Sequence, residues 1–122
     1  MALRALVVDD SMLVRHTVCR FLEQRGYEVE SASNGVEALE KLAHASPDIV
    51  ITDMAMPRMS GSELIDSLKA RPETASIPIV VLSGRPSGSD AQGETRATFV
   101  IQKDIDIVQQ LEKALVGALG KA

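Results

Sequence analysis

Acidic and hydroxyl side chains follow three apolar runs of this 122-residue sequence, and a lysine follows another. Asp9 and Asp10 come after the first run, Asp53 comes after the third, Ser83 closes the fourth and Lys103 follows the fifth. If the runs are parallel strands of one sheet, their carboxyl ends lie at the same edge, where open α/β folds bind ligands. We therefore expect these side chains, although far apart in the sequence, to converge.

A cluster of this composition suits phosphoryl chemistry. Three carboxylates placed close together repel one another and raise their own pKa values unless a cation lies between them, and an all-oxygen cluster favours a hard ion such as Mg²⁺. An aspartate beside that ion can attack phosphorus and form an aspartyl phosphate, while an ammonium group and a hydroxyl orient the transferred oxygens. Asp53, Lys103 and Ser83 supply these three parts.

The elements that would position these residues alternate regularly along the chain. Apolar runs and amphipathic stretches follow one another, which is typical of a parallel sheet covered by helices on both faces. The expected strands are 2–8, 27–32, 48–52, 77–83 and 98–102, and the expected helices are 11–26, 34–45, 60–70 and 104–120. Between the last two strands, 84–97 contains three Gly and one Pro and is expected to be a loop or a short, frayed helix.

Helix signals support this division. Ser11 and Asn34 are expected N-caps, Glu37 three residues after Asn34 predicts a capping box, and Gly26 is expected to stop the first helix. Helical spacing predicts that the following side chains face the core: Val14, Val18, Phe21 and Leu22; Val36, Leu39 and Leu42; Leu64, Ile65 and Leu68; and Ile107, Val108, Leu111, Leu115 and Leu119.

Composition limits the classes of protein. The net charge of −4 gives no basic surface for nucleic acid or an anionic membrane, and the single cysteine excludes an intramolecular disulfide. The sequence lacks a signal-peptide pattern and any run approaching the ~20 apolar residues of a membrane span. We expect one cytoplasmic domain, 1–122, that contacts neither nucleic acid nor membrane directly.

Four short motifs carry a resemblance to a known family. They are "VVDDS" with its acid pair, "ITDMAMPRMSG" with the spacing D-x-x-M-P-x-M-x-G, "VVLSG" with its hydroxyl, and "VIQK" with its lysine. Each motif alone is weak, but the four occur in the right order at the right intervals over essentially the whole chain. The sequence therefore resembles the receiver domains of two-component response regulators, of the chemotaxis-regulator type.

The resemblance implies a flavodoxin-like (βα)₅ fold with strand order 2-1-3-4-5. It also implies a site in which Asp9 and Asp10 bind Mg²⁺, Asp53 is the phosphoacceptor and also a metal ligand, Ala55 offers its backbone carbonyl to the ion, and Ser83 and Lys103 bond phosphoryl oxygens. The implied partners are a histidine kinase or phosphotransfer protein and a downstream output protein or domain, with a phosphorylation-dependent homodimer left open. Such a domain is a signalling switch with slow autodephosphorylation rather than an enzyme.

Two residues depart from the family pattern. Asp104 stands where the family usually has a proline with a cis bond, and a cis bond before Asp would cost several kcal/mol, so we expect a trans loop. Val100 occupies the position of the family's aromatic switch residue, while Phe99, one position earlier, should face the other side of its strand. We therefore expect 84–96 to be the segment that moves on activation.

The same residues argue against two alternative functions. An aspartate-nucleophile phosphohydrolase needs a second acid two residues after its nucleophile, where this chain has Ala55. A degenerate receiver that only docks partners is disfavoured by the intact acids, hydroxyl and lysine. His16 is interpreted as a solvated helical residue and Cys19 as a packing residue, and Met54 and Met59 are expected to pack around the turn after the third strand.

Overall fold

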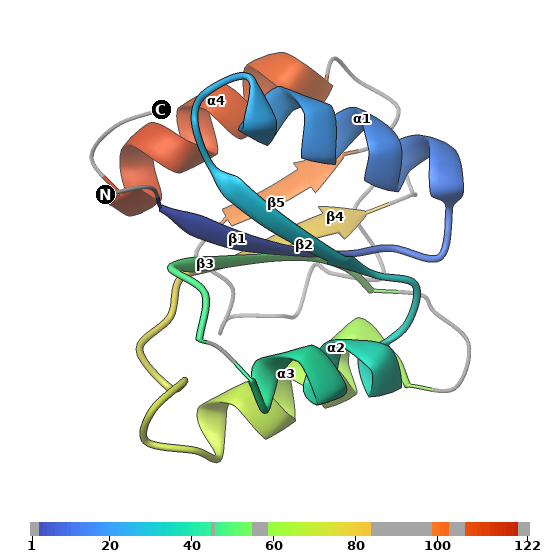
Figure 1. The fold of residues 1–122 in the computed structure, drawn as a ribbon, viewed down its shortest axis with the longest axis vertical. Helices are drawn as coiled ribbons and strands as arrows, with labels where there is room; N and C mark the ends of the chain where they lie inside the picture. The colour runs from blue at the N-terminus through green and yellow to red at the C-terminus, as the bar shows by residue number, and fades with distance from the viewer. Residues whose placement is uncertain (1–2, 45, 55–58, 84–98, 103–106, 120–122) are drawn as a thin grey trace.

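The chain forms a five-stranded parallel sheet between two layers of helices (Figure 1). The computed structural model describes residues 3–44, 46–54, 59–83, 99–102 and 107–119. The elements are β1 (Arg4–Val8), α1 (Met12–Glu23), β2 (Glu28–Ala32), α2 (Gly35–Leu42), β3 (Ile49–Asp53), α3 (Gly61–Lys69), β4 (Ile79–Ser83), β5 (Phe99–Gln102) and α4 (Ile107–Leu119). The strand order β2-β1-β3-β4-β5 confirms the predicted fold.

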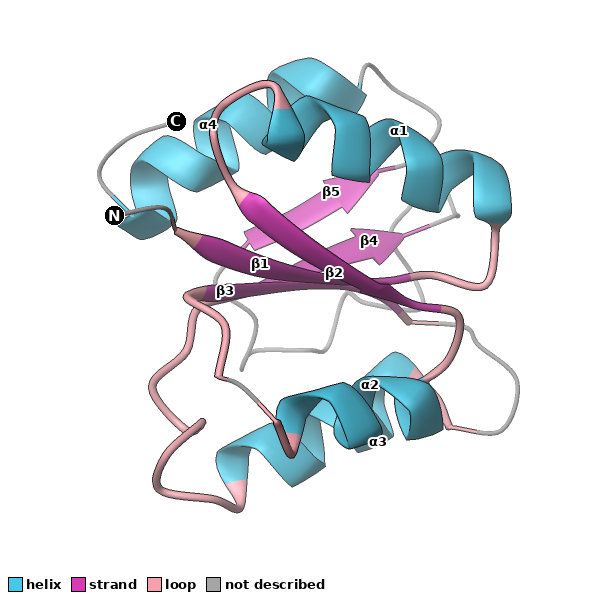
Figure 2. Ribbon diagram, in the orientation of Figure 1, coloured by secondary structure: helices cyan, strands magenta, loops and turns pink. Residues whose placement is uncertain are grey.

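Each face of the sheet carries its own apolar core. Successive residues of a strand point to opposite faces, so Ala5 and Val7 face α1 and α4, whereas Leu6 and Val8 face α2 and α3 (Figure 2). The first core includes the fully buried side chains of Leu22, Ile51, Leu111 and Leu115, and the second includes Leu64, Ile65, Leu68 and Val81. Because both faces are covered, the central strand β3 is buried throughout and β1 is buried from Ala5 to Val8, whereas the edge strand β2 alternates.

The helices begin and end largely where the sequence signals predict. The side chains of Ser11, Asn34 and Ser60 accept hydrogen bonds from the backbone N–H groups three residues later and so cap α1, α2 and α3. Gly26 has a φ of 86°, a left-handed conformation that suits glycine, and it ends the turn after α1. The three N-caps therefore fix the residues at which α1, α2 and α3 begin.

The capping box predicted for α2 is displaced by one residue. The Asn34 side chain accepts from the Glu37 N–H at 2.9 Å as expected, but the Glu37 carboxylate accepts from the Ser33 N–H at 2.7 Å. The Ser33 hydroxyl donates to the same oxygen at 2.9 Å. The hydrogen bond from the Ser33 backbone is the main reason that the pKa of Glu37 is held below its ordinary value.

Glu37→Gln should therefore reduce the free energy of unfolding at pH 7, by less than about 1 kcal/mol because water screens this charge. A depressed carboxyl pKa adds stability above its unfolded value, so the loss relative to the wild type should shrink as the pH falls below the ordinary glutamate pKa of 4.5. Urea unfolding at several pH values measures this. Glu40→Gln, on an exposed position of α2, is the control, and equal losses at pH 7 and pH 3 would contradict the assignment.

Two expected core residues lie at the edge of the buried stripe instead. Val36 is only half-buried, because Gly35, Ala38 and Leu42 form the buried stripe of α2. Val108 is 37% exposed, because the adjacent Ile107 packs against the core in its place. The side chain of Leu119 and the whole segment 84–97, expected to be loop or frayed helix, lie outside the described residues.

Phe99 and Val100 face opposite sides of β5, as predicted. Phe99 packs against the core under α1 and α4, and its ring lies so close to Gly117 of α4 that an added Cβ there would come within 2.3 Å of it. Val100 is 44% exposed. The Phe99 ring of β5 therefore packs against α4.

Candidate metal centre

Three aspartates at the ends of the neighbouring strands β1 and β3 meet at the carboxyl edge of the sheet. Asp9, Asp10 and Asp53 each offer a carboxylate oxygen, and these oxygens all lie within 4.8 Å of one another. Asp9 is fully buried and Asp53 is 4% exposed, whereas Asp10 is exposed. The pairing register explains the meeting, because Val8 of β1 lies opposite Thr52 of β3, directly before the acids.

Backbone and side-chain contacts hold the β1–α1 turn that carries two of these acids. The Asp9 N–H donates to the Ala32 carbonyl at 3.1 Å, which ties the turn to the end of β2. The Ser11 N–H donates to Oδ1 of Asp9 at 2.8 Å. Arg15, one turn into α1, donates from Nη1 to the Asp9 carbonyl at 2.7 Å. The turn therefore has little freedom to move the acids apart.

Asp53 is held by the packing of α3 against the end of β3. The Gly61 N–H donates to the Met54 carbonyl at 2.9 Å, and the Thr52 hydroxyl donates to the Asp53 carbonyl at 2.9 Å. A Cβ on Gly61 would lie 2.2 Å from the Asp53 carbonyl oxygen and 2.8 Å from the Met54 Cα. Only a glycine allows this close approach of helix and strand.

The amino end of α2 packs against the segment that follows β3. Gly35 lies against the side chain of Met59, where an added Cβ would come within 2.6 Å of the Met59 Cγ. Met59 packs against the core under α2 and α3, and Met54 is buried in the same core. The expectation that both methionines pack around the turn after β3 is confirmed.

Not every predicted site residue can be placed. Ala55 and Lys103 lie outside the described residues, as does Asp104. The backbone of Ser83 ends β4 opposite Gln102 of β5, at the same edge of the sheet as the acids, but its side chain is not described. The structure thus brings together the three acids and places one further strand end beside them.

Sequence reasoning missed two residues that position the acids. Gly61 was part of the quoted motif, but nothing in its identity revealed a contact with the Asp53 backbone. Arg15 carried no signal beyond being a basic residue near an acid pair. Both act through backbone carbonyls, which a pattern of side chains does not show.

The donor set fits a hard divalent cation. Three carboxylate oxygens within 4.8 Å of one another, two of them on buried residues, match the oxygen ligands and the charge that Mg²⁺ prefers. An exposed Asp10 leaves one side of the cluster open to water, which Mg²⁺ usually keeps as part of its coordination. The residues present therefore suit the ion that the sequence predicted.

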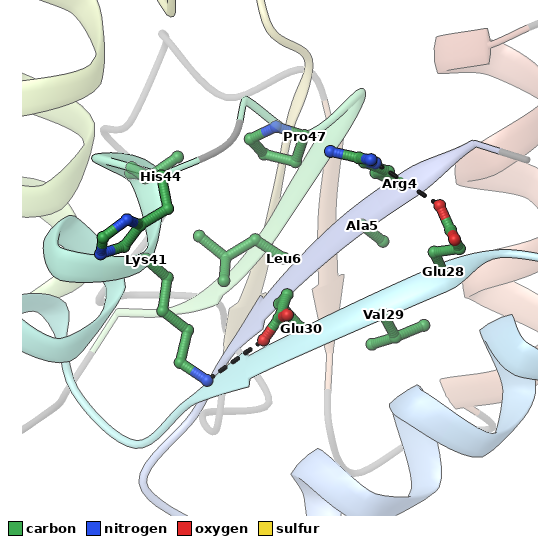
Figure 3. A pocket seen from close by; sticks show the side chains of 10 residues that line it. Arg4, Ala5, Leu6, Glu28, Val29, Glu30, Lys41, His44 and Pro47 are labelled. Atoms are coloured by element: carbon green, nitrogen blue, oxygen red, sulfur yellow. Dashed lines mark hydrogen bonds and ion pairs between the residues drawn. The ribbon is translucent and has the colours of Figure 1, made fainter.

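The cavity of about 500 Å³ shown in Figure 3 lies at the opposite edge of the sheet. Leu6 and Leu42 form part of its apolar lining, and two surface ion pairs, Arg4–Glu28 and Lys41–Glu30, lie along it. Its lining comes from the amino ends of β1 and β2 and the carboxyl end of α2, with none of the clustered acids. The cavity is therefore separate from the acid site.

The outer face of α1 borders the acid site. Met12 and Leu13, in its first turn, are 75% and 76% exposed. His16 is also exposed, which confirms it as a solvated residue, and Cys19 is half-buried against the core as predicted. Burial raises the pKa of the Cys19 thiol.

Among the residues that the structure describes, no helix is both long and apolar enough to cross a lipid bilayer.

Comparisons with known proteins identify the family. The response regulator receiver domain family matches residues 5–115. Response regulator MprA of Mycobacterium sp. (strain KMS) is 43% identical over 90 residues, which make up 74% of this chain and 38% of that protein. The chain therefore spans well under half the length of this relative.

Solved structures agree. The chemotaxis response regulator CheY4 of Vibrio cholerae has a TM-score of 0.83 at 32% identity, with 94% of this chain and 100% of that chain covered. The signal receiver domain of a signal transduction histidine kinase from Syntrophus aciditrophicus has a TM-score of 0.84 at 30% identity, with 98% and 92% covered. This chain therefore belongs to the response regulator receiver domains, the signalling switches of two-component systems.

Proposed function

We propose that the chain, acting as one receiver unit over 1–122, accepts a phosphoryl group on Asp53 and changes conformation in response. The observation that carries this proposal is the convergence of Asp9, Asp10 and Asp53 within 4.8 Å at the carboxyl edge of the sheet. Carboxylates this close repel one another unless a cation lies between them. Binding of a cation and then of a phosphoryl group would explain why a buried carboxylate lies beside two others. A structural cap would not require three acids.

Asp53 has a second role in this proposal that Asp9 and Asp10 do not share. A carboxylate oxygen of Asp53 attacks the phosphorus of a phosphohistidine, the P–O bond forms, the P–N bond breaks, and the nitrogen of the donor keeps the electron pair. Asp9, Asp10, Asp53 and the backbone carbonyl of Ala55 would hold Mg²⁺. When bound, the ion supplies positive charge that offsets the acids and the transferred oxygens.

Ser83 and Lys103 complete the proposed site by resemblance to the family. The hydroxyl would bond one phosphoryl oxygen and the ammonium another, so that binding of the phosphoryl group pulls on the ends of β4 and β5. The end of β4 lies beside β3 and β5 in the sheet, which supports this placement. Slow hydrolysis of the aspartyl phosphate by water would reset the switch.

The phosphodonor is proposed to be a histidine kinase or a phosphotransfer protein in the cytoplasm. Met12 and Leu13 expose apolar side chains directly beside the acid turn, which is where a donor must approach to reach Asp53. A phosphorylation-dependent homodimer is proposed from the family resemblance alone.

A phosphorylation assay tests the proposed function. Incubated with acetyl phosphate and Mg²⁺, the wild-type domain should gain the mass of one phosphoryl group, and chelation of the metal should reduce labelling to background because the three acids then repel the anionic donor. Intact-mass spectrometry follows both reactions. Equal labelling with and without metal would contradict the metal centre, and no labelling in either case would favour a docking module that works without phosphorylation.

A further inference from the structure

Arg15 is a basic side chain that contacts the acid turn. It lies in the first half of α1 and is half-buried, and its Nη1 donates to the Asp9 carbonyl at 2.7 Å. A hydrogen bond from a guanidinium to a carbonyl is charge-assisted and is stronger than one between neutral groups. Figure 1 shows the β1–α1 turn leading directly from the end of β1 into this helix.

The carbonyl that Arg15 holds lies between two of the acids. It belongs to the peptide unit that joins Asp9 to Asp10, and because a peptide unit is planar, fixing its oxygen fixes the direction in which the chain continues to Asp10. The N–H of Asp9 is fixed on the other side by Ala32. The hydrogen bond from Arg15 therefore restrains the peptide unit that leads to Asp10, the exposed member of the cluster.

The positive charge of Arg15 also acts on two groups outside the acid turn. Its positive charge helps to lower the pKa of Glu37, a smaller effect there than the hydrogen bond from the Ser33 backbone. It also opposes the burial that raises the pKa of Cys19. The hydrogen bond from Arg15 goes to the backbone carbonyl of Asp9 rather than to a carboxylate.

We propose that Arg15 is a positioning residue of the metal centre, which orients the Asp9–Asp10 peptide so that the carboxylates of both residues converge on Asp53. The proposal rests on the proposed function for its biological meaning, since a preformed cation site is useful only if the cation takes part in phosphoryl transfer. Arg15 itself contacts neither the cation nor the phosphoryl group in this proposal.

Magnesium titration is the direct test. Arg15→Ala should raise the Mg²⁺ concentration at half-saturation about tenfold, the size expected when a residue that orients a metal ligand is removed. Arg15→Lys should raise it about two- to threefold, because an ammonium can donate to the same carbonyl but lacks the rigid planar fork. NMR shifts of the Asp10 and Ser11 amides follow the titration. Arg20→Ala and Arg20→Lys, on an exposed position of α1, are matched controls and should leave the midpoint unchanged.

Labelling with acetyl phosphate separates positioning from contact with the donor. If Arg15 acts only through the cation site, Arg15→Ala should shift the Mg²⁺ midpoint of the labelling rate about tenfold and leave the rate at saturating Mg²⁺ within about twofold of the wild type. A lower saturated rate with an unchanged midpoint would show that Arg15 contacts the donor and would overturn the proposal. Unchanged midpoints combined with a lower melting temperature would overturn it too, because a purely structural role predicts that result.

The two proposals fail in different ways. If the wild type binds Mg²⁺ but is not labelled, the proposed function fails while the titrations still decide the role of Arg15. If the wild type is labelled and the Arg15 variants keep its Mg²⁺ midpoint, only the role of Arg15 fails. Should Arg15→Ala not fold, Arg15→Lys compared with Arg20→Lys decides: a two- to threefold higher midpoint supports the proposal, and equal midpoints refute it.

Discussion

Asp53→Asn is expected to abolish labelling by acetyl phosphate while leaving the fold intact. Asparagine has nearly the same shape, so the side chain at a position that is 4% exposed should still pack. Its amide cannot take up the phosphoryl group as a carboxylate does, and the cation cluster loses one of its three charges. Intact-mass spectrometry should show background labelling, and magnesium titration should show a weaker site.

Asp66→Asn is the matched control for this variant. Asp66 is an exposed acid on α3, away from the acid cluster, and its replacement should leave the extent and rate of labelling unchanged. Labelling of Asp53→Asn at the rate of the wild type would show that another side chain is the phosphoacceptor. Peptide mapping of the labelled protein would then identify that side chain.

Gly61→Ala is expected to destabilise the protein by about 3 kcal/mol, at the upper end of the usual cost of forcing extra atoms into a packed site. The added Cβ would lie 2.2 Å from the Asp53 carbonyl oxygen and 2.8 Å from the Met54 Cα. Both are backbone atoms of the segment that ends β3, so the clash can be relieved only by moving α3 or the strand end. Urea unfolding measures the loss, and the labelling rate should fall because Asp53 moves.

Gly26→Ala provides a contrast within the same chain. An added Cβ on Gly26 meets nothing within 4 Å, so the cost comes only from its φ of 86°, about 1–2 kcal/mol for a residue with a side chain. This variant should lose stability but keep the labelling rate. If Gly61→Ala costs no more than Gly26→Ala, the approach of α3 to β3 is looser than the distances indicate.

The parallel sheet and the convergence of the acids at its edge were predictable, because each follows from a strong pattern in the sequence. Continuous apolar runs between amphipathic stretches indicate buried parallel strands, and parallel strands place their carboxyl ends at one edge. The convergence of Asp9, Asp10 and Asp53 follows from that alone. The strand order was taken from the family resemblance, because no local pattern in the sequence determines which strands are neighbours.

The remaining details depend on contacts between elements. Val36 and Val108 have the apolar character of core residues, but neighbouring residues of the same helices occupy the buried positions in their place. The Glu37 carboxylate accepts from Ser33 because the chain entering α2 brings that N–H nearer. Arg15 and Gly61 act on backbone atoms of another segment, and periodicity within a segment cannot reveal such partners.

The ion pairs along β2 have a consequence for self-association. β2 is an edge strand, and its outer backbone groups could pair with a strand of another molecule. Glu28 and Glu30 project from it, and their pairs with Arg4 and Lys41, at 3.5 and 3.3 Å, are exposed contacts that add little stability. A second copy adding its own β2 alongside would bring these charged side chains together and would have to remove water from them. The glutamates thus discourage molecules from aggregating through the outer edge of β2, even at high protein concentration.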